Sequence, residues 1–170
     1  MKIWLGSILL AVMALGACAQ SKALDKTGAA PGAAEDQAVY IIRHLQKAEG
    51  SDPPLTAEGT AAAEQLAAML ADKGIAAIYA TATRRAMDTA APLSRATGIA
   101  VVQYDARDPA ALVAEVAAVE GSVLVVGHSN TVPDLVTRFG GHPAPVMTEK
   151  DYGTVYAVGA SGTLRALAVE

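Results

Sequence analysis

Five basic side chains follow short apolar runs in a pattern suited to the chemistry of a phosphate group. They are Arg43, His44, Arg84, Arg85 and His128. The apolar runs 39–42, 75–80 and 123–126 predict short buried strands. Ligands in open α/β sheets bind just outside the carboxyl ends of strands. Three strand ends therefore deliver two imidazoles and two or three guanidinium groups, a set that fits a phosphate handled by an imidazole.

The elements that must position these side chains alternate along the chain. Strands are predicted at 39–42, 75–80, 99–104 and 122–126, with a closing pair at 154–158 and 164–169. Helices are predicted at about 56–72, 83–98, 109–119 and 133–140, with caps or first-turn prolines at their starts. This alternation predicts an α/β fold, a three-layer α/β/α sandwich with a mostly parallel central sheet.

The composition narrows the classes of partner. With 170 residues, 52% of them hydrophobic, the chain can build one domain with its own core. The formal net charge of −4 argues against a nucleic-acid partner held by counterion release. A small anionic ligand remains compatible, because local arginines override a mild overall acidity.

The first 17 residues have the pattern of an export signal. Lys2 precedes an apolar region, residues 3–15, which is short for a membrane span. The only cysteine, Cys18, ends the sequence Leu-Gly-Ala-Cys, which resembles the lipobox of bacterial lipoproteins. That resemblance implies cleavage before Cys18 and lipidation of this residue. Ordinary cleavage after Ala19 is the alternative, because Ala17-Cys18-Ala19 has the small-x-small form.

Either cleavage exports the rest of the chain. Residues 18–37 lack apolar periodicity and are predicted to form a flexible tether, so that the folded domain spans 38–170. With a lipid on Cys18, the domain is expected in the cell envelope, anchored to a membrane and facing the periplasm. No acidic residue follows the cysteine at Ala19 or Gln20, which by analogy favours the outer membrane.

Four segments in order resemble the histidine phosphatase superfamily, the phosphoglycerate-mutase-like group. They are Arg43-His44, Leu55-Thr56-Ala57-Glu58-Gly59, the segment Arg85-Ala86-Met87-Asp88-Thr89-Ala90, and Gly127-His128. The resemblance extends from about Ala38 to Gly141 and implies a phosphoglycerate-mutase-like fold. The family often has a small residue after Arg-His, whereas this chain has Leu45.

Carried over to this chain, the resemblance implies a role for each matching residue. His44 is the nucleophile that becomes phosphorylated, Arg43 and Arg85 bind the phosphoryl oxygens, and His128 is the second histidine of the pocket. Arginine presents a rigid fork of donors that matches phosphate, and a neutral imidazole can attack phosphorus and later leave to water. Asn130, at the start of the last long helix, is expected to help bind the anion.

The general acid is the least defined part of this site. The acid-phosphatase branch of the family carries Asp after its second histidine, but this chain has Ser129. Asp105, after the third predicted strand, ranks first among the carboxylates. Asp108 and Glu49 are the alternatives, and Asp108 is equally well explained as the cap of the helix that begins at Pro109.

Two other functions compete with a phosphatase. Gly127-His128-Ser129-Asn130-Thr131 partly matches the nucleophile elbow of α/β-hydrolases, which would make Ser129 the nucleophile of an esterase. The chain departs from that motif, because Thr131 replaces the last glycine. The second rival is a non-catalytic envelope lipoprotein whose phosphatase-like domain only binds a phosphorylated ligand.

The preferred interpretation is an exported phosphatase without a cofactor. It would hydrolyse a small phosphorylated substrate or a phosphoprotein through a phosphohistidine on His44. A metal site formed by His44, His128 and His142 is conceivable, but the chain lacks the usual spacing of metal ligands. We therefore expect a metal-independent reaction and no nucleic-acid partner.

Overall fold

The computed structural model describes residues 37–140, 142 and 146–169. The predicted signal segment, the predicted lipidation site Cys18 and nearly all of the predicted tether lie outside these residues. Within the described part of the chain, none of the helices is long and apolar enough to cross a membrane.

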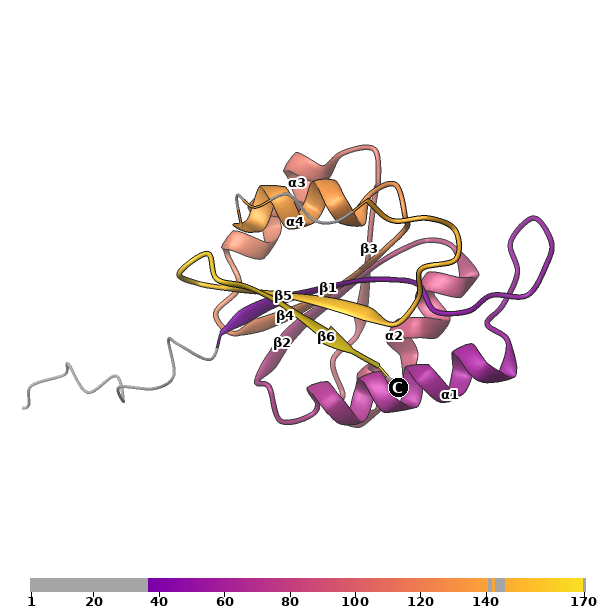
Figure 1. The fold of residues 1–170 in the computed structure, drawn as a ribbon. Helices are drawn as coiled ribbons and strands as arrows, with labels where there is room; N and C mark the ends of the chain where they lie inside the picture. The colour runs from indigo at the N-terminus through magenta and orange to yellow at the C-terminus, as the bar shows by residue number, and fades with distance from the viewer. Residues whose placement is uncertain (1–36, 141, 143–145, 170) are drawn as a thin grey trace, which may run out of the picture.

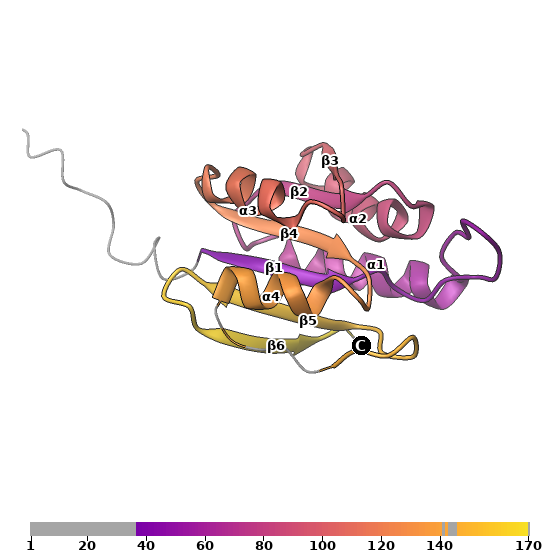
Figure 2. The same ribbon diagram turned by 90° about the horizontal axis from the view of Figure 1, so that it is seen from above.

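One mixed sheet runs through the domain, with its strands in the order β3-β2-β4-β1-β5-β6 (Figure 2). The strands are β1 (Ala38–Arg43), β2 (Ile75–Thr81), β3 (Val101–Tyr104), β4 (Ser122–Gly127), β5 (Thr154–Gly159) and β6 (Leu164–Ala168). The pairs β1–β4, β2–β4 and β2–β3 are parallel, whereas β5 pairs antiparallel with β1 and with β6. The predicted parallel arrangement therefore applies to the four strands β1, β2, β3 and β4, whereas β5 and β6 add an antiparallel edge.

Helices cover both faces of this sheet (Figure 1). Helices α1 (Ala57–Leu70) and α2 (Arg84–Thr97) lie on one face, and α3 (Pro109–Ala117) and α4 (Val132–Gly140) lie on the other. The predicted caps form at two of them: the Thr56 hydroxyl accepts the N–H of Gly59 at 3.1 Å, and the Asp108 carboxylate accepts the N–H of Ala111 at 3.1 Å. Helix α2 continues through Pro92 to Thr97.

The two central strands, β1 and β4, consist mainly of apolar residues, as expected of strands buried on both faces. Ile42 and Leu124 pack toward α1 and α2, whereas Ile41 and Val125 belong to the core beneath α3 and α4. Strands β1 and β4 are direct neighbours with parallel register, and Arg43 lies opposite Gly127. The Arg-His and Gly-His segments therefore leave the sheet side by side, at the carboxyl ends of adjacent strands.

Candidate active site

The two predicted histidines meet where β1 and β4 end. The N–H of His44 donates to the carbonyl of Gly127 at 2.9 Å, which extends the pairing of the two strands by one residue. The ring centres of His44 and His128 are 5.3 Å apart in an edge-to-face arrangement. The expectation that strand ends assemble these side chains is therefore met by hydrogen bonding of the parallel sheet.

The ring of His44 is oriented by a hydrogen bond to the backbone of the next residue. Its Nδ1 lies 2.9 Å from the carbonyl oxygen of Leu45. A carbonyl can only accept, so Nδ1 carries the proton of the neutral ring and Nε2 keeps its lone pair. Burial lowers the pKa of His44 to about 4, with smaller contributions from the charges of Arg43 and Arg85, against the raising effect of the Leu45 hydrogen bond. The ring is therefore neutral at pH 7.

His128 is held through both ring nitrogens. Its Nε2 lies 2.9 Å from the hydroxyl of Thr81, at the end of β2, and its Nδ1 lies 3.5 Å from Nη2 of Arg85. Because the guanidinium only donates, Nδ1 accepts and Nε2–H donates to the threonine. Burial is the main cause that lowers the pKa of His128, and the charge of Arg85 adds to it.

Arg43 is almost fully buried and clamps the segment before β5. Its Nη1 donates to the carbonyls of Thr148 at 2.7 Å and Asp151 at 3.2 Å. Its Nη2 donates to the Glu149 carboxylate at 2.9 Å and to the Tyr152 hydroxyl at 3.4 Å. The guanidinium carbon also lies 4.3 Å from the centre of the Tyr152 ring. Four of its five N–H groups are thus engaged, which leaves Nε–H for a ligand.

Arg85 is the more open of the two arginines. Its side chain is 19% exposed, and its Nη1 lies 3.7 Å from the Asp52 carboxylate. The Nε atoms of Arg43 and Arg85 are both buried without a hydrogen-bond partner among the described residues. A buried unpartnered donor on a cation is unfavourable, and an anion bound beside the histidines would satisfy it.

A threonine of α2 fixes the loop that carries the nucleophile. The buried hydroxyl of Thr89 accepts the N–H of Leu45 at 3.0 Å and donates to the carbonyl of Arg85 at 2.8 Å. The threonine in the Arg-Ala-x-x-Thr-Ala segment thus connects the residue after His44 to the helix that carries Arg85. The motif was recognised in the sequence, but the role of this hydroxyl was not.

The segment at the start of α1 supports the same loop. A Cβ atom on Gly59 would lie 2.2 Å from the carbonyl oxygen of Gln46, two residues after the nucleophile. The N–H of Thr56 donates to that same carbonyl at 2.9 Å. Glycine is therefore required at this position of the Leu-Thr-x-x-Gly segment because the helix approaches the loop backbone closely.

The glycine before His128 is confined in a similar way. A Cβ atom on Gly127 would lie 2.8 Å from the Thr131 hydroxyl and 3.1 Å from the hydroxyl of Tyr104. The Thr131 hydroxyl in turn accepts the N–H of His128 at 2.9 Å. Burial raises the pKa of Tyr104 to about 12, so its phenol stays neutral.

Two predicted site residues lie toward the surface. The exposed carboxylate of Asp105 accepts Nε and Nη2 of Arg107 at 3.0 and 2.7 Å, and this pairing lowers the pKa of Asp105 to about 2. Such a carboxylate holds no proton at pH 7, which disfavours Asp105 as the general acid. Asn130 is exposed and lines a pocket of about 250 Å³ together with Tyr104 and Asp134.

Ser129, the nucleophile of the esterase alternative, donates to a carboxylate. Its Oγ lies 2.7 Å from Oε1 of Glu149, so the contact that a serine hydrolase makes with histidine is made here with an acid. Glu149 is exposed, but its carboxylate also contacts Arg43, which precedes His44.

No three histidine, cysteine, aspartate or glutamate side chains gather as a metal site within the part of the chain that the structure describes. The structure carries no ligands.

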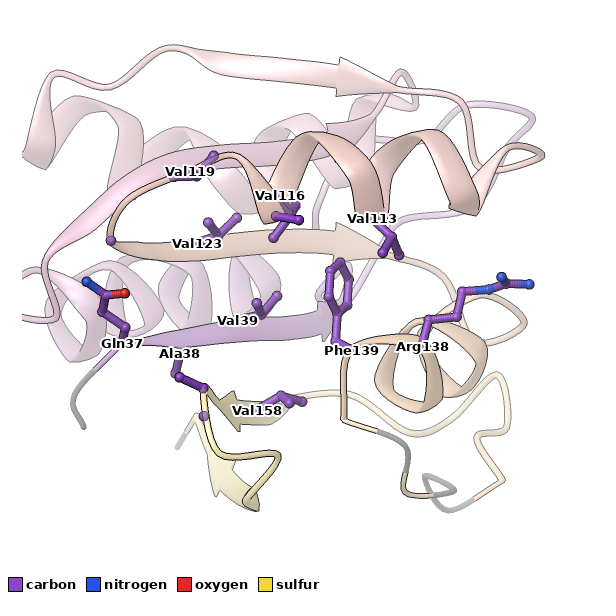
Figure 3. A pocket seen from close by; sticks show the side chains of 14 residues that line it. Gln37, Ala38, Val39, Val113, Val116, Val119, Val123, Arg138, Phe139 and Val158 are labelled. Atoms are coloured by element: carbon purple, nitrogen blue, oxygen red, sulfur yellow. The ribbon is translucent and has the colours of Figure 1, made fainter. Parts of the chain in front are cut away.

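A cavity of about 480 Å³ lies at the opposite end of the sheet (Figure 3). It opens beside the starts of β1 and β4, where valines and Phe139 make up half of the lining residues and Arg138 lies at one side (Figure 3). It contains neither histidine of the candidate site. Because it lacks a nucleophile, we do not assign the chemistry to it.

Part of this chain matches a known protein family. Residues 39–108 match the family model described as histidine phosphatase superfamily, branch 1. The comparison with curated proteins finds no match.

Several solved structures share the fold. The protein histidine phosphatase SixA in complex with tungstate is 23% identical, with a TM-score of 0.60 over 77% of this chain and 94% of that chain. The putative phosphohistidine phosphatase SixA from Agrobacterium tumefaciens is 23% identical, with a TM-score of 0.57 over 78% and 96% of the two chains. The mycobacterial glucosyl-3-phosphoglycerate phosphatase Rv2419c with inorganic phosphate is 18% identical, with a TM-score of 0.59 over 78% and 95%.

The match of residues 39–108 to the histidine phosphatase superfamily agrees with the fold and with the two histidines assembled beside Arg43 and Arg85.

Proposed function

We propose that this protein is a phosphatase that transfers the phosphoryl group of its substrate to Nε2 of His44 and then to water. The observation that carries the proposal is the state of His44, a buried neutral imidazole whose Nδ1–H is held by the Leu45 carbonyl. The two arginines beside it each keep a buried unpartnered Nε–H. A nucleophile with a free lone pair thus lies among donors that suit phosphoryl oxygens.

The proposed reaction has two displacements at phosphorus. In the first, Nε2 of His44 forms a bond to phosphorus while the P–O bond breaks; the leaving oxygen keeps the electron pair and takes a proton from solvent, and the imidazole becomes cationic. The Leu45 carbonyl stabilises that cation because it accepts the Nδ1–H. In the second, water attacks phosphorus and loses a proton to solvent, the N–P bond breaks with its electron pair returning to Nε2, inorganic phosphate leaves, and the ring is neutral again. The arginines offset the charge on the phosphoryl oxygens.

The substrate is proposed more broadly, as a small phosphomonoester or a phosphoprotein. One of the structural relatives is described as a protein histidine phosphatase, one as a putative phosphohistidine phosphatase and one as a glucosyl-3-phosphoglycerate phosphatase. These descriptions support phosphate transfer and do not select among substrates. We further propose that the reaction needs no metal, because the arginines provide the positive charge.

The first test measures hydrolysis of p-nitrophenyl phosphate by the full-length protein in EDTA. His44→Ala should lower kcat by at least roughly a thousandfold, as expected for loss of a nucleophile. His142→Ala, at an exposed histidine, serves as the matched control and should keep full activity. Acid quenching should trap a phosphohistidine that is absent from His44→Ala. Activity lost in EDTA, or unchanged in His44→Ala, would refute the mechanism.

Export and lipidation are part of the proposal and concern residues outside those described. Fractionation of cells expressing the full chain should place it in the envelope, with fatty acid incorporated at Cys18. Cys18→Ser should abolish that incorporation. Recovery of unlipidated protein in the periplasmic fraction would instead support ordinary signal cleavage.

A further inference from the structure

Glu149 places a carboxylate beside both catalytic segments. It lies between α4 and β5, and its Oε2 is 2.9 Å from Nη2 of Arg43. Its Oε1 accepts the Ser129 hydroxyl at 2.7 Å. Because Arg43 precedes one histidine and Ser129 follows the other, a single side chain contacts neighbours of both. The Glu149 side chain is 76% exposed, so this negative charge faces solvent at the entrance to the site.

Asp52 holds the equivalent place beside the second arginine. It lies in the loop between β1 and α1, and its Oδ1 is 3.7 Å from Nη1 of Arg85. The same oxygen accepts the backbone N–H of Arg84 at 2.9 Å, which fixes the carboxylate at the start of α2. Like Glu149, it is more than half exposed.

The charges of the titratable groups around the two histidines sum to zero. The cations are Arg43, Arg85 and Lys47, whose charge acts on Glu149. The carboxylates are Glu149, Asp52 and Asp151, the last of which accepts the Thr148 N–H and acts on Arg43. Both histidines are neutral because burial lowers the pKa of each. A phosphate dianion therefore turns the site negative, and its carboxylates lose part of their pairing with the arginines.

We propose that Glu149 and Asp52 select substrates whose leaving group is neutral or positively charged, and that they disfavour a second anionic group beside the phosphate. The inference rests on the proposed phosphatase function. It follows from charge balance, because a cationic leaving group offsets part of the negative charge that the bound phosphate adds. Basic peptides or amines that carry phosphate fit this requirement, whereas phosphorylated carboxylic acids do not.

The test compares three substrates with the same reaction centre. They are phenyl phosphate and its meta-carboxylate and meta-trimethylammonium derivatives, assayed at low ionic strength with the full-length protein. Glu149→Gln keeps an acceptor for Ser129, and Arg43 still contacts the carbonyls of Thr148 and Asp151. Glu64→Gln makes the same change in an exposed ion pair with Arg95, at 2.7 Å between α1 and α2, and is the matched control.

The measured quantity is the ratio of kcat/KM for the cationic over the anionic derivative. Intrinsic differences between leaving groups cancel when this ratio is compared between variant and unaltered protein. The two derivatives differ by two units of charge, from −1 on the carboxylate to +1 on the trimethylammonium group. A screened Coulomb interaction of this charge with Glu149 across roughly 7 Å predicts that Glu149→Gln lowers the ratio about five- to tenfold. Asp52→Asn should lower it in the same direction, and Glu64→Gln should leave it unchanged. High salt should reduce the preference of the unaltered protein.

Two results would overturn the inference. A ratio in Glu149→Gln within about twofold of that in the unaltered protein would exclude charge selection. An equal fall for all three substrates would show that Glu149 only positions Arg43. Failure of the unaltered protein to hydrolyse phenyl phosphate is a different result, because it refutes the proposed phosphatase and this inference with it.

Discussion

The hydroxyl of Thr89 gives the sharpest test of how the nucleophile is positioned. It is fully buried, and it is the acceptor for the N–H of Leu45, the residue whose carbonyl orients His44. Thr89→Val removes the hydroxyl but keeps the shape of the side chain. The change therefore removes the two hydrogen bonds of this hydroxyl, from the Leu45 N–H and to the Arg85 carbonyl, without opening a cavity.

The expected loss of stability in Thr89→Val follows from the Leu45 N–H, which is left without an acceptor. A buried N–H that loses its acceptor costs about 1–3 kcal/mol, and we expect the free energy of unfolding to fall by that amount. The Leu45 backbone then has fewer constraints, and the ring of His44 loses part of its fixed orientation. Because misplacement by about 1 Å costs roughly a hundredfold in rate, kcat should fall about ten- to a hundredfold.

The assay pairs urea denaturation with the kinetics of aryl phosphate hydrolysis. Thr60→Val is the matched control, because the Thr60 hydroxyl makes the same type of contact with the carbonyl four residues earlier, at 2.9 Å, but at an exposed position. Its effect on stability should stay within about 0.5 kcal/mol. Thr89→Ser keeps the hydroxyl and should recover most of the lost kcat. Equal effects of Thr89→Val and Thr60→Val on stability and rate would refute the reasoning.

Three further predictions concern the acid–base and phosphate-binding groups. Since burial holds the pKa of His44 near 4, the acid limb of the kcat/KM profile should lie well below pH 6.5, and a limb at pH 6.5 would contradict this. The free energy of unfolding should fall as the pH is lowered from 6.5 toward 4, because in that range only the unfolded chain gains this proton. Arg43→Lys should lower kcat and should also lower the free energy of unfolding by about 2 kcal/mol or more, because it breaks the buried contacts of the guanidinium. Arg85→Lys should mainly lower kcat/KM. Urea denaturation of both variants tests whether only the first loses stability. Asp105→Asn should keep kcat within about twofold, against the hundredfold loss expected of a general acid.

The residues of the catalytic pocket were predictable from sequence because each signal is local. Apolar runs mark the strands, and His44 and His128 stand directly at the ends of two of them. Such ends lie at one edge of any parallel sheet, so the pattern placed both histidines at that edge, and the strand order made β1 and β4 neighbours. The caps at Thr56 and Asp108 were readable for the same reason, since a cap is decided within one helical turn.

The surroundings of those residues depend on contacts that local patterns do not encode. Arg43 donates four hydrogen bonds to a segment more than 100 residues later in the chain. That segment lies beside Arg43 because β5 pairs antiparallel with β1. Glu149 belongs to that segment, and only this pairing brings its carboxylate to the site. The role of Thr89 likewise depends on how α2 packs against the loop after β1.

The sequence by itself therefore determined which groups are candidates for the chemistry and at which strand ends they stand. The tertiary structure decided their state: the proton on Nδ1 of His44, the donors left free on the arginines, and the carboxylates beside them. These properties arise from burial and from hydrogen bonds between distant segments. Periodicity and local propensity describe neighbours along the chain, whereas protonation and charge depend on neighbours in space.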